Sequence, residues 1–169
     1  MKILVLAEIN NGELAEDQTS KTVSAAATLG KVDVLCASSQ CSDASTNIAK
    51  MENVENVLVL EDALFAQSLA ESYSETLIDT IKLYSHIFAP SSSFGKNVLP
   101  RVGGMLDVMV ISDVSKVISE DTFERPVYAG NAIQTVQSVD KVKLISVRTS
   151  NYRALTITGK ANIKKILKN

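Results

Sequence analysis

The stretch His86-Ile-Phe-Ala-Pro-Ser-Ser-Ser-Phe-Gly-Lys-Asn97 joins a short apolar run to a serine-rich segment that contains glycine and lysine. The run 86–89 has the length and composition of a strand that is buried on both faces. Residues 97–106 have helical character and carry Pro100 in the first predicted turn, where proline is tolerated. A buried strand, a polar loop and a helix in this order form the repeating unit of an α/β fold.

The same alternation extends along the chain on the N-terminal side of this stretch and just beyond it. Further apolar runs with the character of buried strands are 3–7, 32–36, 57–60 and 109–111. Segments with helical spacing are 14–30, 43–50 and 65–83, and the last of these is the longest, with one stripe of Leu69, Tyr73, Leu77 and Ile81. Because strands that alternate with helices are joined by right-handed crossovers, the sequence predicts a parallel sheet.

The pattern changes after residue 114, where helical spacing gives way to short β-rich pieces. These pieces are 115–119, 124–129, 132–137 and 142–148. Gly130-Asn131 lies between two of them and is typical of a tight turn. We therefore predict a three-layer α/β/α domain with a parallel sheet and an antiparallel β extension in the C-terminal third.

The end of the chain has a weaker hydrophobic rhythm than the rest. Residues 160–169 carry four lysines and place Ile163, Ile166 and Leu167 on one helical face. This stretch is too short to act as a membrane-surface helix. We predict one domain over 1–150, and a linker or tail over 151–169 that leads towards a further domain.

Composition limits the classes of function. The chain has 169 residues, a hydrophobic fraction of 46% and a formal net charge of −2, which fit one globular domain. A nucleic-acid-binding protein would need a basic face, so we expect no nucleic-acid partner. No segment reaches the roughly 20 apolar residues that cross a bilayer. The opening residues also lack the features of a signal or transit peptide, so we expect a cytoplasmic protein without direct membrane insertion.

Cys36 and Cys41 are the two cysteines, and His86 is the single histidine. The short spacing of the cysteines permits a disulfide, but two ordinary thiols are the simpler interpretation in a reducing compartment. These three residues are too few and too scattered for a structural zinc site, so no metal is expected. His86 opens an apolar strand, which favours a structural role over membership of a Ser-His-Asp triad.

Gly95, Lys96 and Asn97 form a candidate anion-binding loop after the strand 86–89. The carboxyl edge of a parallel sheet is where open α/β folds bind ligands, and backbone amides at a helix start attract anions. The segment is not a Walker motif, because it has one glycine and asparagine follows the lysine. The alternative is that Gly95 permits a tight turn and a serine caps the helix.

Three arginines are candidates for contacts. Arg125 precedes Pro126, which keeps Arg125 extended, and a rigidly presented guanidinium suits a carboxylate or a phosphate. The alternative for Arg101, Arg125 and Arg148 is an ordinary ion pair within the chain. Tyr128, Gly130 and Asn131 indicate a shaped loop tip, since glycine allows close backbone approach.

Four blocks of the sequence together resemble a known family. They are Ser-Phe-Gly-Lys-Asn-Val-Leu-Pro-Arg at 93–101, Leu-Asp-Val-Met-Val-Ile-Ser-Asp-Val at 106–114, Phe-Glu-Arg-Pro-Val-Tyr-Ala-Gly-Asn-Ala at 123–132 and Ile-Ser-Val-Arg at 145–148. In this order they resemble the N-terminal domain of the electron transfer flavoprotein alpha subunit. The resemblance implies an α/β fold of the adenine-nucleotide alpha-hydrolase-like type.

The resemblance also implies a function, which we state as an expectation. The family forms a heterodimer with a beta subunit and carries one FAD. It passes electrons from dehydrogenases, such as the acyl-CoA dehydrogenases of fatty acid beta-oxidation, to a membrane quinone reductase. The FAD lies mainly in a C-terminal domain, which we expect to be absent, so this chain should hold no FAD and no catalytic site. Family members also occur in the mitochondrial matrix, the alternative to a bacterial cytoplasm.

The positions that match motifs of this domain are assigned to loop architecture or to domain and subunit contacts. They are Gly95, Lys96, Asn97, Arg101, Arg125, Tyr128, Gly130 and Asn131. The alternative function is a stand-alone nucleotide-binding module that uses the loop after the strand 86–89. An independent hydrolase has little support, because no nucleophile has an evident base.

Overall fold

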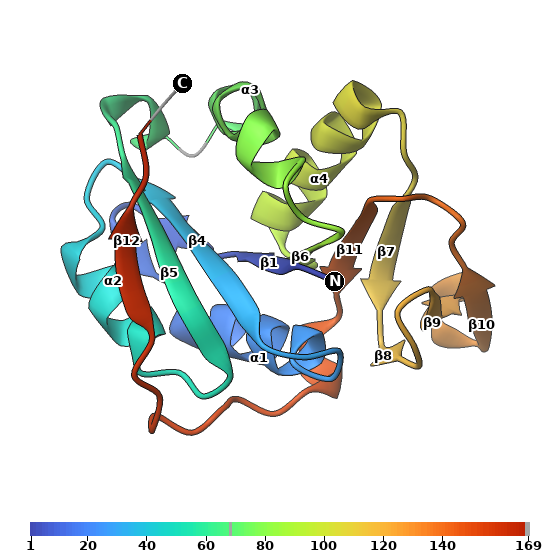
Figure 1. Ribbon diagram of the computed structural model, residues 1–169. Coiled ribbons are helices and arrows are strands. Elements are labelled where there is room, and N and C mark those ends of the chain that lie inside the picture. Colours follow the sequence, from blue (N-terminus) through green and yellow to red (C-terminus); the bar gives the residue numbers. More distant parts are fainter. Residues whose placement is uncertain (68, 168–169) are drawn as a thin grey trace.

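The computed structural model describes residues 1–67 and 69–167, and its centre is a seven-stranded sheet (Figure 1). The strand order is β12-β5-β4-β1-β6-β11-β7, and all six neighbouring pairs are parallel. The strands are β1 (Ile3–Leu6), β4 (Val32–Ser38), β5 (Val54–Glu61), β6 (His86–Pro90), β7 (Val110–Val114), β11 (Lys143–Val147) and β12 (Asn162–Lys165). The predicted parallel sheet is confirmed.

Helices cover both faces of this sheet. On one face lie α1 (Glu16–Ala26) and α2 (Ser42–Ala49), and on the other lie α3 (Ala70–Ile81) and α4 (Ser93–Leu106) (Figure 1). Successive residues of a strand point to opposite faces, so Val5 packs in one apolar cluster while Leu4 and Leu6 pack in the other. The predicted three-layer α/β/α architecture is thus confirmed.

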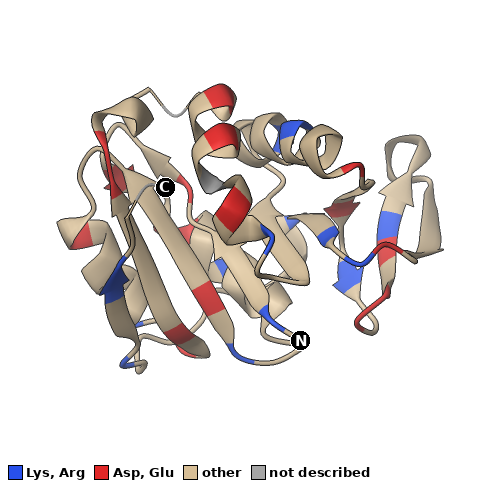
Figure 2. Cartoon of the chain, turned by 45° about the horizontal axis from the view of Figure 1, so that its top comes forward, with Lys and Arg blue, Asp and Glu red and all other residues tan. Residues whose placement is uncertain are grey.

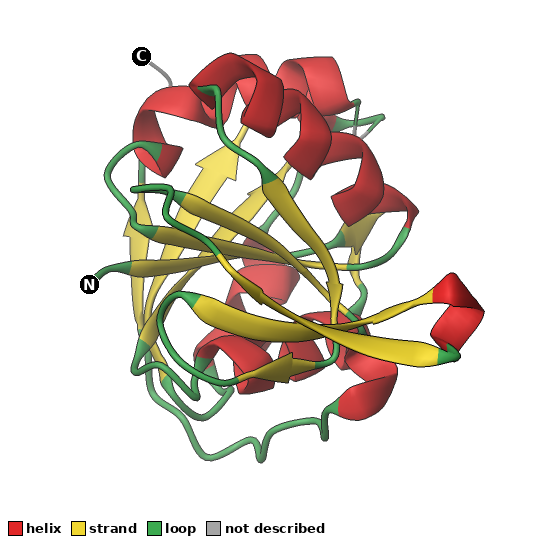
Figure 3. Cartoon of the chain, turned by 90° about the vertical axis from the view of Figure 1, so that its right-hand side faces the viewer, coloured by secondary structure: helices red, strands yellow, loops and turns green. Residues whose placement is uncertain are grey.

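Several smaller elements lie outside the central sheet and the four helices. A hairpin of β2 (Ile9–Asn10) and β3 (Glu13–Leu14) precedes α1, and three short 3-10 turns lie at Ala63–Phe65 (η1), Tyr128–Gly130 (η2) and Thr149–Asn151 (η3). An antiparallel sheet of β8 (Lys116–Val117), β9 (Thr122–Val127) and β10 (Ala132–Gln137) lies between β7 and β11 in the chain. Figure 3 shows β9 and β10 reaching out to η2 at their shared tip. This sheet is the predicted antiparallel extension.

Strand β11 was predicted as one of the pieces of that extension, but it belongs to the parallel core. It pairs with β6 and with β7, and Leu144 and Ile145 are fully buried on opposite faces of the sheet. Only β8, β9 and β10 form the antiparallel sheet. The chain therefore leaves the core after β7 and returns to it through β11.

Two predicted helix boundaries were wrong. The segment 65–83 holds the end of η1 and then α3, which is shorter than the 14-residue α4. Leu69 precedes α3 and is 48% exposed, whereas Tyr73 and Ile81 are buried, and the side chain of Leu77 lies outside the described residues. Helix α4 begins at Ser93 rather than at 97, so Pro100 lies in its interior and not in its first turn.

The end of the chain forms an edge strand rather than a helical face. Residues 162–165 of β12 pair in parallel with residues 56–59 of β5. Ahead of this strand the chain passes so close to the residues that follow α2 that a Cβ on Gly159 would lie 2.2 Å from the carbonyl oxygen of Met51. The division of the chain at residue 150 stays a prediction.

Candidate functional site

The candidate anion loop lies inside the first turns of α4. Ser92 is the N-cap, and its Oγ accepts the N–H of Gly95 at 3.5 Å, which confirms that a serine caps this helix. Gly95 is not in a turn. A Cβ at this position would lie 1.9 Å from the carbonyl oxygen of Pro90, so glycine is needed for close packing of α4 on β6. Lys96 and Asn97 are exposed on the opposite side.

The first turn of α4 differs from the first turns of the other helices in its charge. Acidic residues occupy this turn in α1, α2 and α3, namely Glu16 and Asp17, Asp43, and Glu71. The first turn of α4 has no acid and is followed by Lys96. Because a helix N-terminus favours negative charge, α4 is the helix that suits an exogenous anion, although Ser92 already takes one of its N–H groups.

We expect Lys96→Ala to leave both stability and nucleotide response almost unchanged. Lys96 is exposed, and an exposed substitution of this kind changes the free energy of unfolding by under about 0.5 kcal/mol. Thermal melts of the original and variant chains, each with and without millimolar AMP, measure both effects. An AMP-dependent rise in melting temperature that Lys96→Ala abolishes would favour the nucleotide-binding module instead.

Two buried polar atoms near the carboxyl ends of β1 and β6 have no hydrogen-bond partner among the described residues. They are Glu8 Oε2 and Ser91 Oγ. Glu8 is otherwise held, since its Oε1 accepts from Asn10 Nδ2 at 3.2 Å and its N–H donates to Thr19 Oγ1 at 3.3 Å. Strand order reverses between β1 and β6, which is the usual ligand crevice of an open α/β sheet. In this chain the crevice contains the carboxylate of Glu8.

His86 has the structural role that the sequence predicted. It is buried at the start of β6, with Nδ1 2.9 Å from Ser85 Oγ and Nε2 2.6 Å from the carbonyl oxygen of Glu120. Burial is the main cause that lowers the pKa of its imidazole. Both ring nitrogens are therefore occupied by neighbours from the amino-terminal edge of the sheet and from the segment before β9.

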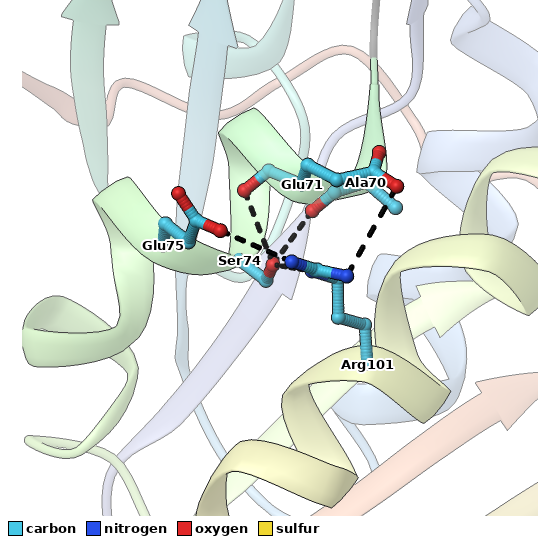
Figure 4. Close-up of polar contacts among 5 residues, drawn as sticks. All are labelled: Ala70, Glu71, Ser74, Glu75 and Arg101. Carbon is cyan, nitrogen blue, oxygen red and sulfur yellow. Dashed lines mark hydrogen bonds and ion pairs between the residues drawn. The ribbon is translucent and has the colours of Figure 1, made fainter.

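Arg101 is engaged within the chain. Its Nε donates to Ser74 Oγ at 2.9 Å, and its Nη2 donates to Glu75 Oε1 at 3.0 Å, while Glu71 lies 4.0 Å away (Figure 4). Ser74 in turn donates to the carbonyl oxygen of Ala70 at 2.7 Å. The guanidinium thus joins α4 to α3. This is the ordinary ion pair within the chain that was the alternative interpretation of Arg101.

Arg125 and Arg148 lie together at a pocket beside the carboxyl ends of β7 and β11. Nη1 of Arg148 lies 3.4 Å from Oδ2 of Asp113, so this arginine has a weak ion pair. Arg125 differs, because its Nε is buried and has no hydrogen-bond partner among the described residues. The pocket has a volume of about 520 Å³, and its lining is Asp113, Arg125, Pro126, Val127, Tyr128, Ala129, Gly130 and Arg148.

The tip of the β9–β10 hairpin closes one side of this pocket in an unusual backbone conformation. Tyr128, Ala129 and Gly130 have φ angles of 52°, 53° and 89°, and the N–H of Asn131 donates to the carbonyl oxygen of Tyr128. The predicted turn at Gly130-Asn131 is thus part of a four-residue tip. Tyr128 is 81% exposed, and two left-handed non-glycine residues cost free energy that a binding surface can recover.

Sequence reasoning missed two features of this pocket and the hairpin beside it. Asp113 was not singled out, yet it has φ 58° within β7 and reaches Arg148 from the next strand of the sheet. Ile133, which is 59% exposed on β10, was not singled out. A large apolar residue beside the loop tip was the signal available for Ile133.

The described residues were also searched for a charged face, a metal site and a membrane-spanning helix. Acidic and basic positions are interspersed over the molecule (Figure 2). Within 1–67 and 69–167, no group of three or more His, Cys, Asp and Glu side chains is placed to hold a metal ion. In the same residues, no helix has the length and apolar character that a bilayer crossing requires.

Comparison with known proteins gives a consistent result. A family model described as the electron transfer flavoprotein domain matches residues 3–167. The chain is 47% identical to the electron transfer flavoprotein subunit alpha of Paracoccus denitrificans over 163 residues, which are 96% of this chain and 53% of that protein. For the Pseudomonas aeruginosa subunit alpha the identity is 44%, over 94% of this chain and 52% of that protein.

A eukaryotic relative matches in the same way. The mitochondrial electron transfer flavoprotein subunit alpha of Dictyostelium discoideum is 40% identical over 95% of this chain and 48% of its own length. The chain therefore spans about half the length of the curated relatives that it matches. The similarity includes the sheet, its helices and the β9–β10 hairpin.

Proposed function

The chain belongs to the electron transfer flavoprotein family, and we propose that it forms the N-terminal scaffold domain of an alpha subunit. The observation that carries this proposal is the family match over residues 3–167, which spans the whole sheet from β1 to β12. In this role the domain supplies a rigid α/β body and contact surfaces. It has no catalytic site of its own, and the full heterodimer acts as an electron carrier.

The residues of this chain do not fit FAD. A pyrophosphate needs free N–H groups at a helix start and no nearby acid. Glu16 and Asp17 occupy the first turn of α1, and Glu61 accepts the N–H of Cys41 at the start of α2. At α4, which suits a single anion, Ser92 Oγ already accepts the N–H of Gly95, and residues 86–94 ahead of it contain no glycine that would let the backbone wrap a pyrophosphate. We propose that the full-length protein holds its FAD outside the residues described here.

The tip of the β9–β10 hairpin is the proposed contact with an electron transfer flavoprotein beta subunit. Arg125 has a buried Nε that lacks an acceptor among the described residues, and an acidic side chain or carbonyl oxygen from a partner would supply one. Tyr128 and Ile133 are exposed side by side on one pocket, and tyrosine and arginine are common anchors of interfaces. Gly130 and Asn131 hold the tip in shape, whereas Lys96, Asn97 and Arg101 are secondary candidates for domain contacts.

The wider role follows from the family. We propose that the heterodimer accepts electrons from dehydrogenases, such as acyl-CoA dehydrogenases, and passes them to a membrane quinone reductase. We propose a bacterial cytoplasm as its location, since two of the relatives above are bacterial proteins, and the mitochondrial matrix is the alternative.

Co-expression of this chain with its cognate beta subunit tests the proposal. We expect the two chains to co-purify, and we expect Arg125→Ala and Tyr128→Ala each to weaken the complex by about 30-fold in Kd, because anchor residues contribute 2 kcal/mol or more. Arg153→Ala is the matched control, since Arg153 is exposed and is not among the residues that line the pockets at the hairpin tip. Titration calorimetry measures each Kd.

The outcomes separate the two parts of this proposal. If the original chain does not bind the beta subunit at all, the assignment as an alpha-subunit scaffold is contradicted. If the chain binds but Arg125→Ala and Tyr128→Ala behave like Arg153→Ala, the family role stands and the hairpin tip is not the contact.

A further inference from the structure

Two cysteine thiols meet beneath the loop between β4 and α2. Cys36 lies in β4, Cys41 is the N-cap of α2, and both are free. The exposed fractions of the two residues are 0% and 1%. Cys41 Sγ lies 3.4 Å from the carbonyl oxygen of Cys36 and 3.8 Å from the carbonyl oxygens of Ser38 and Leu60. The fold thus places the Cys41 sulfur against the backbone of Cys36, so the two thiols lie close together, which the five-residue spacing alone did not establish.

The two sulfurs are not equivalent. The hydrogen bond from the Cys36 thiol is the main cause that lowers the pKa of Cys41, and the same bond raises the pKa of Cys36. Cys41 is therefore the thiol that reaches the thiolate form first, and Cys36 keeps its proton. Glu61 acts in the other direction on Cys41. Its carboxylate accepts the Cys41 N–H at 2.8 Å, and its negative charge raises the pKa of the Cys41 thiol.

The dithiol is buried but lies just below the surface. Ser39 and Gln40 precede Cys41 in the loop and are exposed, and so is Ser42 after it. The loop belongs to no strand, so its opening breaks few backbone hydrogen bonds and leaves the sheet intact. Small oxidants can reach Cys41 through such an opening without global unfolding.

We propose that Cys36 and Cys41 form a reversible internal disulfide when the chain meets a hydroperoxide. The Cys41 thiolate attacks the terminal oxygen of the hydroperoxide, the O–O bond breaks, and Cys41 becomes a sulfenic acid. The other oxygen leaves as an alkoxide, or as hydroxide from hydrogen peroxide, and takes up a proton from solvent. The sulfur of Cys36 then attacks the Cys41 sulfur, the S–O bond breaks as the S–S bond forms, and the sulfenic oxygen leaves as water with the proton of the Cys36 thiol. The two thiols are oxidised by two electrons and the peroxide is reduced by two.

The disulfide changes the contacts around Cys41. Its N–H bond to Glu61 fixes the start of α2, and Glu61 Oε2 lies 3.9 Å from Lys165 Nζ at the end of β12. Movement of Cys41 towards Cys36 weakens both contacts. Oxidation should therefore raise amide hydrogen exchange at the start of α2 and at the end of β12, and leave exchange in β1 and β6 unchanged.

Treatment of the folded 169-residue chain with hydrogen peroxide tests the proposal. After alkylation of free thiols and digestion, we expect a peptide that joins Cys36 to Cys41 with a mass lower by two hydrogens, and we expect dithiothreitol to restore both thiols. The reaction should run at temperatures well below the melting transition. Retention of both thiols until the chain unfolds, or oxidation of one cysteine without the bond, would overturn the proposal.

Variants test the order of the two steps. Cys36→Ala should stop the reaction at a Cys41 sulfenic acid, which dimedone captures, whereas Cys41→Ala should leave Cys36 unreacted. Because both positions are in the core, Glu61→Gln provides a test that keeps both sulfurs. Loss of this carboxylate should speed thiol loss several-fold at neutral pH, and an unchanged or slower rate would overturn the assignment of Cys41 as the attacking thiolate.

Discussion

Gly95→Ala is expected to destabilise the chain by about 3 kcal/mol, at the upper end of the usual cost of overpacking a core. The added Cβ would stand 1.9 Å from the carbonyl oxygen of Pro90 and 3.3 Å from the Cβ of Ala89. The obstacle is backbone in the buried strand β6, so it cannot rotate away as a flexible side chain would. Helix α4 must move from the sheet, and its contacts through Val98 and Leu99 are then lost.

Gly104→Ala is the matched control in the same helix. A Cβ at Gly104 meets nothing within 4 Å, so this change should stabilise the chain by about 0.5–1 kcal/mol through helix propensity. Thermal and urea unfolding of both variants measure the difference. We expect the melting temperature of Gly95→Ala to fall by about 6–12 °C. Equal melting temperatures for the two variants would show that α4 can shift without cost.

Phe123→Ala is expected to cost about 3–5 kcal/mol, the range for loss of a buried phenylalanine. Phe123 is fully buried in β9 and belongs to the apolar cluster that contains Ile111 and Val147. In the antiparallel sheet it stands opposite Val117 and Val136. This one side chain therefore anchors the β9–β10 hairpin to the parallel core, and its loss should free the hairpin before the sheet unfolds.

Ile133→Ala on the same hairpin is the control, because Ile133 is exposed and should change stability by under about 0.5 kcal/mol. Limited proteolysis follows the hairpin, and circular dichroism follows the whole chain. We expect Phe123→Ala to be cut within 122–137 at temperatures where Ile133→Ala is intact. Resistance equal to that of the control would mean that the hairpin has another anchor.

The core strands were predictable because each is a continuous apolar run. β1, β4 and β6 are buried on both faces, so no alternation of polar residues hides them. Their order in the sheet was not predictable in the same way. β11 inserts between β6 and β7, although 142–148 follows the antiparallel pieces in the chain, and this placement depends on pairing between residues that are far apart in sequence.

The start of α4 shows why a helix boundary was wrong. Gly95 and Pro100 both count against a helix on local propensity. Gly95 is nevertheless required, because only a residue without Cβ lets α4 approach Pro90. Pro100 is tolerated on the solvent side, where water can satisfy the carbonyl oxygen of Lys96, and both residues are exposed. Neither reason is visible in a window of neighbouring residues.

The candidate site was predictable as a set of residues but not as an arrangement. The sequence singled out Arg101, Arg125 and Arg148 as cations of interest and favoured Arg125 for its rigid presentation before Pro126, and the fold pairs Arg101 with α3 and Arg148 with Asp113. Within the described residues, Nε of Arg125 is buried without an acceptor. Partners from α3 and β7 decide which guanidinium remains available, and these partners lie 20 or more residues away in the chain.

By itself, the sequence determined the layer architecture, the core strands β1, β4, β5, β6 and β7 and the family, because hydrophobic period and short motifs are properties of neighbouring residues. The tertiary structure alone decided the place of β11, the edge strand at 162–165 and the approach of Cys41 to Cys36. In β12 the apolar spacing of Ile163, Ile166 and Leu167 favoured a helix, but the free backbone edge of β5 provides hydrogen bonds that outweigh so short a helical preference. Long-range backbone pairing and side-chain contact are not encoded in any local pattern, so they appear only when the chain is folded.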